Sequence, residues 1–383
     1  MGTLIPYLII ANISVVIAVY GGYALWLKLA PSHRVAHQLA SFRPKVSMIV
    51  PVYNESKIIE KRLDNIKSIS YPRDKFEVIF VDGNSSDGTR ESIQNRINSG
   101  ESYIRLISEP TREGINAAMA TGILNSDSDV LALGEAAAYD DPEAITRLVD
   151  HLSDEEVGVV TGRAIVLNQD EGFLPKLEVE YRSFQDFVRI GESRIDSTVE
   201  TKGELLVARR EVCMKMIPKV DQLKHGSFDV SLSYQAKLHG FRAIYEPNAK
   251  FYEYAPSTLH DRFRVKTLRA GFFIGSLISF RSMFFNKKYG EFGRIILPAR
   301  LVMFVVVPWF VLTSAALLIA DIFIDPILAL TFWIPLAIAM LSRRIRVIVT
   351  SFGLSQIALI AGQLRLLFGR TSQIFDKAPS TRR

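Results

Sequence analysis

The hydrophobic positions of this chain form two patterns, long uncharged runs toward both ends and short apolar runs in the middle. Residues 4–27 contain no charged side chain and exceed the roughly 20 residues that an α-helix needs to cross a bilayer. Residues 301–320 form a second run of this kind, and residues 326–341 form a shorter third one. The pattern predicts one membrane span near the N-terminus and two in the C-terminal part.

A fourth apolar region, residues 347–368, differs from the others because polar side chains interrupt it: Gln356, Gln363 and Arg365. Four cations follow the first apolar run: Lys28, Arg34, Arg43 and Lys45. A fourth crossing would place the basic tail 370–383 outside the cell. Because cytoplasmic segments carry an excess of Lys and Arg, we expect an external N-terminus, three crossings, a re-entrant or interfacial segment at 347–368, and a cytosolic tail.

The middle of the chain alternates short β-rich runs with helical patterns. Residues 45–53 (KVSMIVPVY) and 76–83 (FEVIFVDG) have the pattern of buried parallel strands, and a helical pattern at 56–69 separates them. Two further apolar runs, 102–109 and 129–135, continue the alternation around another helical pattern. This order predicts an α/β fold with a doubly wound sheet that binds ligands at the carboxyl ends of its strands.

Beyond about residue 256 the composition changes, because cations are mixed with Phe, Leu and Ile at helical spacing. This pattern predicts amphipathic helices in the bilayer interface, although a solvated basic face on a globular helix has the same pattern. The chain then divides into five segments: a transmembrane helix (1–30), a cytosolic domain (45–255), amphipathic interfacial helices (256–293), transmembrane or re-entrant helices (294–369) and a basic cytosolic tail (370–383).

The composition narrows the class of protein. Hydrophobic residues make up 48% of the 383 residues, and the mean hydropathy is +0.16, which is too apolar for an ordinary cytosolic enzyme. The net charge of +6 is modest, and the cations lie beside apolar segments, which favours anionic lipid head groups over nucleic acid as a partner. The single cysteine, Cys213, excludes an intrachain disulfide and a cysteine-based zinc site, so we expect a buried thiol in a reducing compartment.

Polar residues gather where two of the predicted strands end. The segment PVYNES places Pro51, Tyr53 and Glu55 on a loop that enters a helix, where free backbone N–H groups and the positive helix end attract a nucleotide. The next strand ends in VDGNSSDGT, where Asp82 can accept hydrogen bonds from a base or ribose and the residues after it form a tight turn. Each segment alone is a weak signal, but their order and spacing together are far more specific.

Five segments carry a resemblance to a known family: PVYNE, SYPRDKFEVIFVDGNSSDGT, REGINAAMATGI, GELLVARREV and FDVSLSYQAKLHGFRAIYEPNAKFYEYAP. On these segments the chain, from about residue 45 to residue 285, resembles the family 2 glycosyltransferases, with their Rossmann-like GT-A fold. The resemblance implies a nucleotide-sugar donor, with Asp82 at the nucleobase and Arg112 near the phosphates. The residues that it implies in nucleotide binding are Pro51, Tyr53, Glu55, Asp82, Asn84, Arg112 and Glu135.

The metal-binding motif of this family departs here from its usual form. The family places an Asp-x-Asp motif shortly before the Asp-Pro of the next helix, and the corresponding residues are Glu135-Ala136-Ala137. The second acid usually ligates Mn²⁺ or Mg²⁺, which take oxygen ligands, and Ala137 offers none. Three interpretations stay open. In the first, Glu135 holds the metal together with the diphosphate and water. In the second, a neighbouring carboxylate such as Asp140 takes the place of the missing ligand, or the metal is dispensable. In the third, the protein is weakened or inactive, for example because an Asp has been changed to Ala.

The resemblance also implies a catalytic base. Asp229 stands where the family carries a Glu-Asp pair at a helix start, and an Asp near its ordinary pKa can take the proton of an attacking acceptor hydroxyl. Phe228 replaces the Glu, which favours weakly a phosphate acceptor that is already anionic. An ordinary helix N-cap is the alternative role for Asp229. Four residues are expected on the acceptor side: Gly203, Glu204, Arg262 and Arg269.

These features predict a multi-pass cell-membrane protein with a cytosolic catalytic domain that is an inverting glycosyltransferase. It would move one sugar from a UDP- or GDP-linked donor, with family frequency favouring uridine, to a lipid-linked or polyprenyl-phosphate acceptor. A processive polysaccharide synthase is an alternative, although the Q-x-x-R-W signature of such enzymes is absent from RFRVKTLRAG. A catalytically silent scaffold is another, supported by Ala137 and Phe228. The expected partners are the donor, the acceptor and membrane lipids, with no nucleic acid, and a homo-oligomer is compatible with the sequence.

Overall fold

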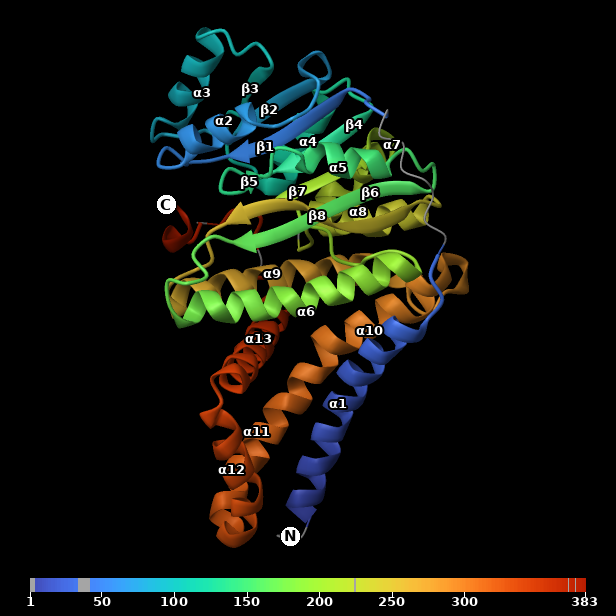
Figure 1. Cartoon of the computed structure of the whole chain (residues 1–383), viewed down its shortest axis with the longest axis vertical. Helices are drawn as coiled ribbons and strands as arrows, with labels where there is room; N and C mark the ends of the chain where they lie inside the picture. The colour runs from blue at the N-terminus through green and yellow to red at the C-terminus, as the bar shows by residue number, and fades with distance from the viewer. Residues whose placement is uncertain (1–3, 34–41, 224, 371, 376) are drawn as a thin grey trace.

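The structure is a computed structural model that describes residues 4–33, 42–223, 225–370, 372–375 and 377–383. Arg34, one of the cations expected on the cytosolic side, lies outside the described residues. A domain built on one sheet stands on two long helices, α6 (Phe173–Ile195) and α9 (Leu259–Ser279), and apolar helices project from the far side of this pair (Figure 1). The domain of mixed polarity and the apolar part are therefore separate in space.

The sheet has eight strands in the order β3-β2-β1-β4-β7-β6-β8-β5. β1 pairs in parallel with β2 and β4, but β7 runs antiparallel between β4 and β6. The sheet is therefore mixed, and the predicted parallel arrangement holds for β1 to β4. An apolar run predicts that a strand is buried on both faces but not its direction. The strands are β1 (Val46–Val52), β2 (Phe76–Asp82), β3 (Ile104–Ser108), β4 (Val130–Gly134), β5 (Tyr139–Asp140), β6 (Val157–Val166), β7 (Leu205–Arg209) and β8 (Arg242–Glu253).

Helices cover both faces of the sheet, each over an apolar core of its own. One core includes Leu63 and Leu148 from α2 and α5, and the other includes Met119 and Leu232 from α4 and α8. Cys213 belongs to the second core, and burial raises the pKa of its thiol to about 12, which confirms the expected buried thiol. The helices of the domain are α2 (Ile59–Lys67), α3 (Thr89–Asn98), α4 (Ile115–Leu124), α5 (Ala144–His151), α7 (Arg210–Met216) and α8 (Phe228–Leu238).

The predicted amphipathic region 256–293 begins with α9 and continues in short turns. Three apolar side chains of α9, Phe272, Phe273 and Leu277, are buried, and the helix packs against α8 and α13. Much of its apolar face therefore packs on protein, which the amphipathic pattern alone does not distinguish from a face that lies in lipid. The side chains of Arg262 and Arg269 line a cavity under the sheet.

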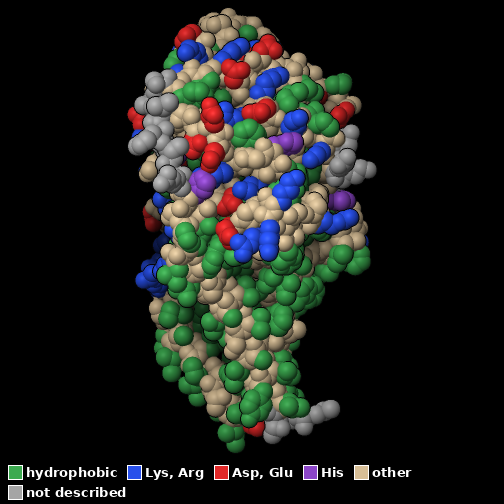
Figure 2. Space-filling model, turned by 90° about the vertical axis from the view of Figure 1, so that its right-hand side faces the viewer, with side chains coloured by type: hydrophobic (Ala, Val, Ile, Leu, Met, Phe, Trp, Pro, Cys, Tyr) green, Lys and Arg blue, Asp and Glu red, His purple; other side chains and the backbone are tan. Residues whose placement is uncertain are grey.

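Among the described residues, three helices are long and apolar enough to cross a membrane: Ile5–Leu29, Phe292–Ile324 and Arg343–Leu367. The predicted span 326–341 is α12, whose 16 residues are fewer than the roughly 20 of a typical span. The region predicted as re-entrant is α13, which has 25 residues and is half buried against the rest of the protein. Figure 2 shows hydrophobic side chains over the projecting part and charged side chains over the sheet domain. The projecting helices are α1 (Ile5–Leu29), α10 (Leu297–Leu301), α11 (Val307–Ile324), α12 (Pro326–Leu341) and α13 (Arg343–Leu367).

A buried ion pair joins the projecting helices to α6. Nε of Arg300 in α10 donates to Oε1 of Glu192 in α6 at 2.7 Å, and the hydroxyl of Tyr23 in α1 donates to the same oxygen at 2.8 Å. Both charged side chains are fully buried. Because a buried charge that loses its partner is costly, this contact holds three helices in one arrangement beneath the sheet domain.

Candidate active site

The loops that follow β1 and β2 lie together at one edge of the sheet, because parallel neighbours end on the same side. The backbone N–H of Ser56 donates to Oδ2 of Asp87 at 2.9 Å and joins the two loops. The guanidinium of Arg112 lies over the ring of Tyr53, with its central carbon 3.9 Å from the ring centroid. Tyr53 and Arg112, both expected at the nucleotide, therefore contact each other.

Asp82 ends β2 with its side chain fully buried. Its Oδ2 accepts hydrogen bonds from Nε and Nη2 of Arg90 at 2.9 and 2.7 Å. Asn84 has a φ of 65°, and its side-chain oxygen lies 3.5 Å from the same Nη2. Asp82 and Asn84 thus lie at the expected edge, and a nucleobase bound there would share Asp82 with Arg90. The sequence pattern did not single out Arg90, since an Arg in the first turn of a helix is ordinarily solvated.

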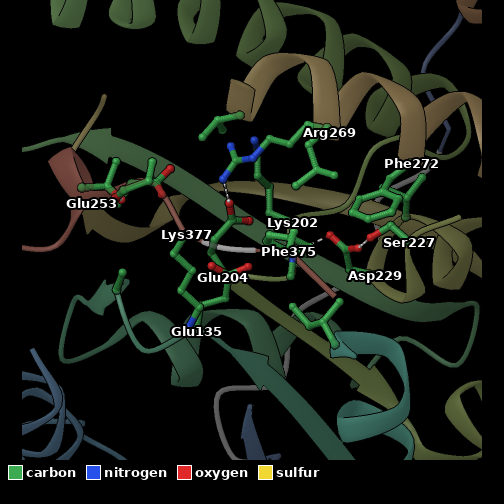
Figure 3. Close-up of a pocket in the computed structure, with 18 of the residues that line it drawn as sticks. Glu135, Lys202, Glu204, Ser227, Asp229, Glu253, Arg269, Phe272, Phe375 and Lys377 are labelled. Carbon is green, nitrogen blue, oxygen red and sulfur yellow. Dashed lines mark hydrogen bonds and ion pairs between the residues drawn. The ribbon is translucent and has the colours of Figure 1, made fainter. Parts of the chain in front are cut away.

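A cavity of about 250 Å³ opens between the ends of β1 and β4, the start of β7, and α9. Figure 3 shows side chains from these separate elements pointing into it. Seven of the predicted site residues line the cavity: Pro51, Glu135, Gly203, Glu204, Asp229, Arg262 and Arg269. The other five lie outside its lining, on the nucleotide side: Tyr53, Glu55, Asp82, Asn84 and Arg112.

Asp229 lies in the first turn of α8, at the wall of the cavity. Its Oδ2 accepts a hydrogen bond from the backbone N–H of Gly203 at 2.8 Å, and its Oδ1 accepts one from the hydroxyl of Ser227. A Cβ at Gly203 would lie 3.1 Å from Oδ2, so the missing side chain permits this approach. Burial raises the pKa of Asp229, and the Ser227 hydrogen bond partly opposes it. The neighbouring Phe228 is buried in the apolar core, and it occupies the position of the Glu in the family's Glu-Asp pair.

Two carboxylates with opposite pKa shifts lie in the cavity. Nη2 of Arg269 donates to Oε1 of Glu204 at 2.7 Å. Burial pushes the pKa of Glu204 upward, but Arg269 and Lys202 outweigh it, and the net pKa is lowered. Burial and then the charge of Glu204 raise the pKa of Glu135 to about 8. Near pH 7 Glu204 is therefore ionised, whereas Glu135 mostly carries a proton.

Glu135 has no oxygen-bearing partner in its own motif, because Ala136 and Ala137 follow it. Among the described residues, no three His, Cys, Asp or Glu side chains come together as metal ligands. The residues present therefore do not fit a divalent-cation site by themselves, and the expected Mn²⁺ or Mg²⁺ stays a prediction for this chain.

Asp140 does not replace the missing ligand. It ends the two-residue strand β5, and its Oδ2 lies 2.8 Å from Nη1 of Arg62 in α2, with both side chains fully buried. The suggestion that Asp140 holds the metal is therefore wrong. Between Glu135 and the next helix, the chain forms β5, and helix α5 begins at Ala144.

A second cavity of about 750 Å³ lies among α1, α6, α9 and α13. Apolar side chains such as Phe184, Met303 and Phe352 line much of it. The two cavities share six lining residues: Glu178, Glu200, Lys202, Lys266, Phe273 and Arg269. A set of charged side chains thus stands between Asp229 and an apolar space among the candidate membrane helices. The sequence reasoning missed Lys202 and Lys266, although Lys202 directly precedes Gly203 in a segment that carries the resemblance.

The C-terminal segment contributes five residues to the lining of the first cavity: Phe375, Lys377, Ala378, Thr381 and Arg382. The sequence predicted only a basic tail here. Sequence spacing carries no signal for this placement, because the ion pairs join residues more than three hundred positions apart.

Comparison with known proteins bears on this site. Residues 47–215 match the family model described as "Glycosyl transferase family 2". A probable glycosyltransferase of Bacillus subtilis, YdaM, is 27% identical over 303 residues, which cover 76% of this chain and 71% of the relative. Glycosyltransferase AglE of Haloferax volcanii is 29% identical over 203 residues, which cover 53% of this chain and 64% of the relative.

The fold is similar to that of the mannosyltransferase PcManGT from Pyrobaculum calidifontis, which was solved in complex with GDP-Man and Mn²⁺. The TM-score is 0.80 at 24% sequence identity, and the match covers 96% of this chain and 100% of the solved one. At this identity the likeness concerns the fold, including the helices that project from the sheet domain, and not the substrate.

Proposed function

We propose a specific reaction for this chain, which is a family 2 glycosyltransferase with a GT-A fold: it transfers one sugar from a nucleotide-sugar to a lipid-linked or polyprenyl-phosphate acceptor. The observation that carries the proposal is the shared wall of the two cavities. An acceptor lipid whose chain lies in the apolar cavity would present its polar end beside Lys202, Lys266 and Arg269. That end would then face Asp229 across one site, which supports catalysis by proximity.

In the proposed reaction Asp229 is the general base. The acceptor oxygen attacks the anomeric carbon from the face opposite the leaving group, so the configuration inverts. Its proton passes to Oδ1 or Oδ2 of Asp229, and the electron pair of the breaking C–O bond leaves on the nucleotide diphosphate. The hydrogen bonds from Gly203 and Ser227 orient the carboxylate, and its raised pKa makes it a stronger base than an ordinary Asp.

A phosphate acceptor changes the demand on Asp229. A phosphate oxygen is already anionic at neutral pH, so no proton needs to leave it during attack. Loss of Asp229 should then reduce transfer to a phosphate less than transfer to a hydroxyl. The size of the loss in Asp229→Asn therefore distinguishes a phosphate acceptor from a hydroxyl acceptor.

We place the catalytic domain on the cytosolic side of the cell membrane. The cations that follow α1, among them Lys28, Arg43 and Lys45, favour a cytosolic position for the domain. Nucleotide-sugars reach the site from solvent on that side. The expected Mn²⁺ or Mg²⁺ would meet Glu135 as the carboxylate of its motif, and no step above depends on it.

The proposal is tested with the full chain in lipid nanodiscs, supplied with radiolabelled UDP- and GDP-sugars and with either polyprenyl phosphate or a lipid-linked sugar. We expect label in the lipid fraction, and we expect Asp229→Asn to lower hydroxyl transfer by roughly 10²-fold or more, the usual contribution of a general base. Asp170→Asn makes the same chemical change at an exposed position and should leave transfer unchanged. Transfer that survives Asp229→Asn in full with a hydroxyl acceptor, or no label in lipid with any donor, would contradict the proposal.

A further inference from the structure

The C-terminal segment, described here as residues 372–375 and 377–383, lies against the nucleotide side of the site. Nε of Arg382 donates to Oε2 of Glu55 at 2.8 Å, and Nζ of Lys377 donates to Oε1 of the same carboxylate. The Glu55 side chain is 1% exposed. One buried acid in the loop after β1 is therefore paired with two basic side chains from the C-terminal segment.

The same segment engages a second residue expected at the nucleotide. Nη2 of Arg112, which stacks on Tyr53, donates to the backbone carbonyl of Phe375 at 2.6 Å. Three residues expected around the nucleotide (Tyr53, Glu55 and Arg112) thus contact the segment or one another. The segment occupies the position that a bound donor would have to reach.

The open volume agrees with this occupation. With the segment in place the cavity holds about 250 Å³, below the roughly 300–1,000 Å³ of pockets that bury a drug-sized ligand. A nucleotide-sugar is at least of that size. We therefore expect the segment to shift when the donor binds and to lie beside the bound donor.

The charge of the donor half of the cavity points to what the segment does after it shifts. Glu135 lines the cavity there, Glu55 lies just outside the lining in contact with Lys377 and Arg382, which do line it, and Ala137 offers no metal ligand. A nucleotide diphosphate brings negative charge that is costly to bury without cations or hydrogen bonds. Arg269 and Lys202 face Glu204 and Glu200 on the other half. On the side of Glu55, Lys377 and Arg382 of the segment are basic side chains that line the cavity, and Arg112 lies just outside the lining, where it contacts the segment's backbone.

We propose that Lys377 and Arg382 bind the diphosphate of the nucleotide-sugar donor, so that the C-terminal segment is a detachable wall of the donor site. This inference rests on the proposed function. In the donor-free state the two cations pair with Glu55, and the arriving diphosphate takes them over. They supply the positive charge that stabilises the leaving diphosphate, the task that a metal ion performs at an Asp-x-Asp motif.

The way in which the segment is held permits this exchange. It forms no strand of the sheet, and its described regular structure is one short turn, Pro379–Thr381. The backbone N–H of Ser380 donates to Oδ2 of Asp261 at 3.2 Å, and Arg383 pairs with the half-exposed Glu171. The contacts of Ser380 and Arg383 contribute little individually. Nearer α13 the segment is held more firmly, because Nε2 of Gln373 donates to the carbonyl of Gly226 at 2.7 Å and the ring of Phe375 packs against Phe272. We therefore expect residues 377–383 to move while Gln373 and Phe375 stay in place.

The test is calorimetric titration of the full chain in nanodiscs with UDP, GDP, UMP and GMP, each in EDTA and in Mn²⁺. The variant is Lys377→Ala/Arg382→Ala. The matched control is Arg370→Ala/Arg383→Ala, which removes one cation just before the segment and one within it, neither of which lines the cavity. Lys377→Arg/Arg382→Lys keeps both charges and serves as the conservative variant.

We expect the unchanged chain to bind one nucleoside diphosphate in EDTA. The double Ala variant should bind it at least about 10-fold more weakly, since hydrogen bonds to charged groups contribute about this much each, and should lose much less affinity for the monophosphate. The control and the conservative variant should stay within about threefold of the unchanged chain on the same scale.

Three results would overturn the inference while leaving the proposed function intact. Tighter diphosphate binding by the double Ala variant would mean that the segment only blocks the site. Equal affinity of that variant and the unchanged chain would mean that the two cations do not touch the diphosphate. Diphosphate binding that is lost in EDTA and is the same in the double Ala variant and the unchanged chain would mean that a metal ion supplies the positive charge at the diphosphate. Binding of none of the four nucleotides by any form would instead reject the proposed function.

Discussion

The carboxylate of Glu55, at the end of the first strand, is 2.8 Å from Nε of Arg382, the penultimate residue of the chain. The contact joins the nucleotide side of the sheet domain to a segment that follows the last projecting helix. It exists because α13 leads the chain back to the sheet domain, where the C-terminus lies near β5 and β8 (Figure 1). Residues 327 positions apart in the sequence therefore meet beside the proposed donor site.

The first prediction concerns the pH dependence of the reaction. The Ser227 hydroxyl donates to Asp229 and lowers its pKa against the larger effect of burial. Ser227→Ala should therefore raise the pKa of Asp229, and the acid limb of kcat/KM for a hydroxyl acceptor should move to higher pH. The rate on the acid limb should fall several-fold while the rate on the plateau above it changes little. An acid limb that stays in place would mean that Asp229 is not the titrating base.

The second prediction concerns Gly203. A methyl group there would lie 3.1–3.2 Å from Cγ, Cβ and Oδ2 of Asp229, so Gly203→Ala should displace the carboxylate by a few tenths of an ångström. Because misplacement of about 1 Å can cost about 10²-fold, we expect kcat to fall by about 10-fold with nucleotide affinity unchanged. Steady-state rates and calorimetry on the same preparation check both parts. A parallel loss of nucleotide affinity would point to a disturbance of the whole site.

The third prediction concerns Glu135, whose pKa of about 8 lies above its unfolded value. A raised folded pKa adds stability that is complete below the unfolded pKa and is lost as the pH rises through the folded one. Glu135→Gln cannot ionise and should keep that stability. The Tm of this variant minus the Tm of the unchanged chain should increase from pH 5 to pH 8 and stay constant above pH 8. For the control Glu155→Gln, at an exposed position, the difference in Tm from the unchanged chain should not depend on pH. A difference in Tm that does not depend on pH for Glu135→Gln would contradict the raised pKa of Glu135.

The fourth prediction concerns the junction between the two halves of the molecule. Arg300→Met leaves the buried Glu192 carboxylate without its cation, which should cost about 3–5 kcal/mol. We expect a clear fall in Tm in nanodiscs, and partial recovery when Glu192→Gln is added. The recovery distinguishes an uncompensated charge from lost packing, because a packing defect would not respond to the second change.

The fifth prediction concerns the motif itself. Ala137→Asp adds an oxygen ligand two positions after Glu135, at a position that lines the cavity. We expect Mn²⁺ to strengthen diphosphate binding by this variant by at least about 10-fold, and to affect the unchanged chain much less, because hard cations need carboxylate oxygens. Ala137→Asn matches the shape without the charge and should gain less. An equal Mn²⁺ response of the unchanged chain would show that Glu135 suffices.

The sequence was most informative where function depends on local structure. The strand ends that carry Tyr53 and Asp82, the helix start at Asp229 and the apolar run of α1 are set by short-range patterns and turn chemistry. These patterns predicted the α/β class and the family, and seven of the predicted site residues line the cavity. They are short-range because a strand and the loop after it need only a few consecutive residues.

The sequence was least informative where contacts join distant segments. It left Asp140 open as one possible substitute ligand, whereas Arg62, 78 residues away, holds it in a buried pair. It did not predict the contact of Arg90 with Asp82, because the order of residue types does not show which of several exposed cations will pair with a given acid. The direction of β7 was equally open, since burial on both faces is compatible with either direction.

The sequence by itself therefore determined which elements form, that several segments are apolar enough to cross a membrane, and which acids lie at strand and helix ends. Only the tertiary structure decided that Glu204 and Glu135 have opposite pKa shifts, because burial and neighbouring charges act through space. The tertiary structure also decided that Lys377 and Arg382 line the cavity and contact Glu55. The physical reason is that an ion pair such as Lys377 with Glu55 depends on where two elements meet and not on their separation along the chain.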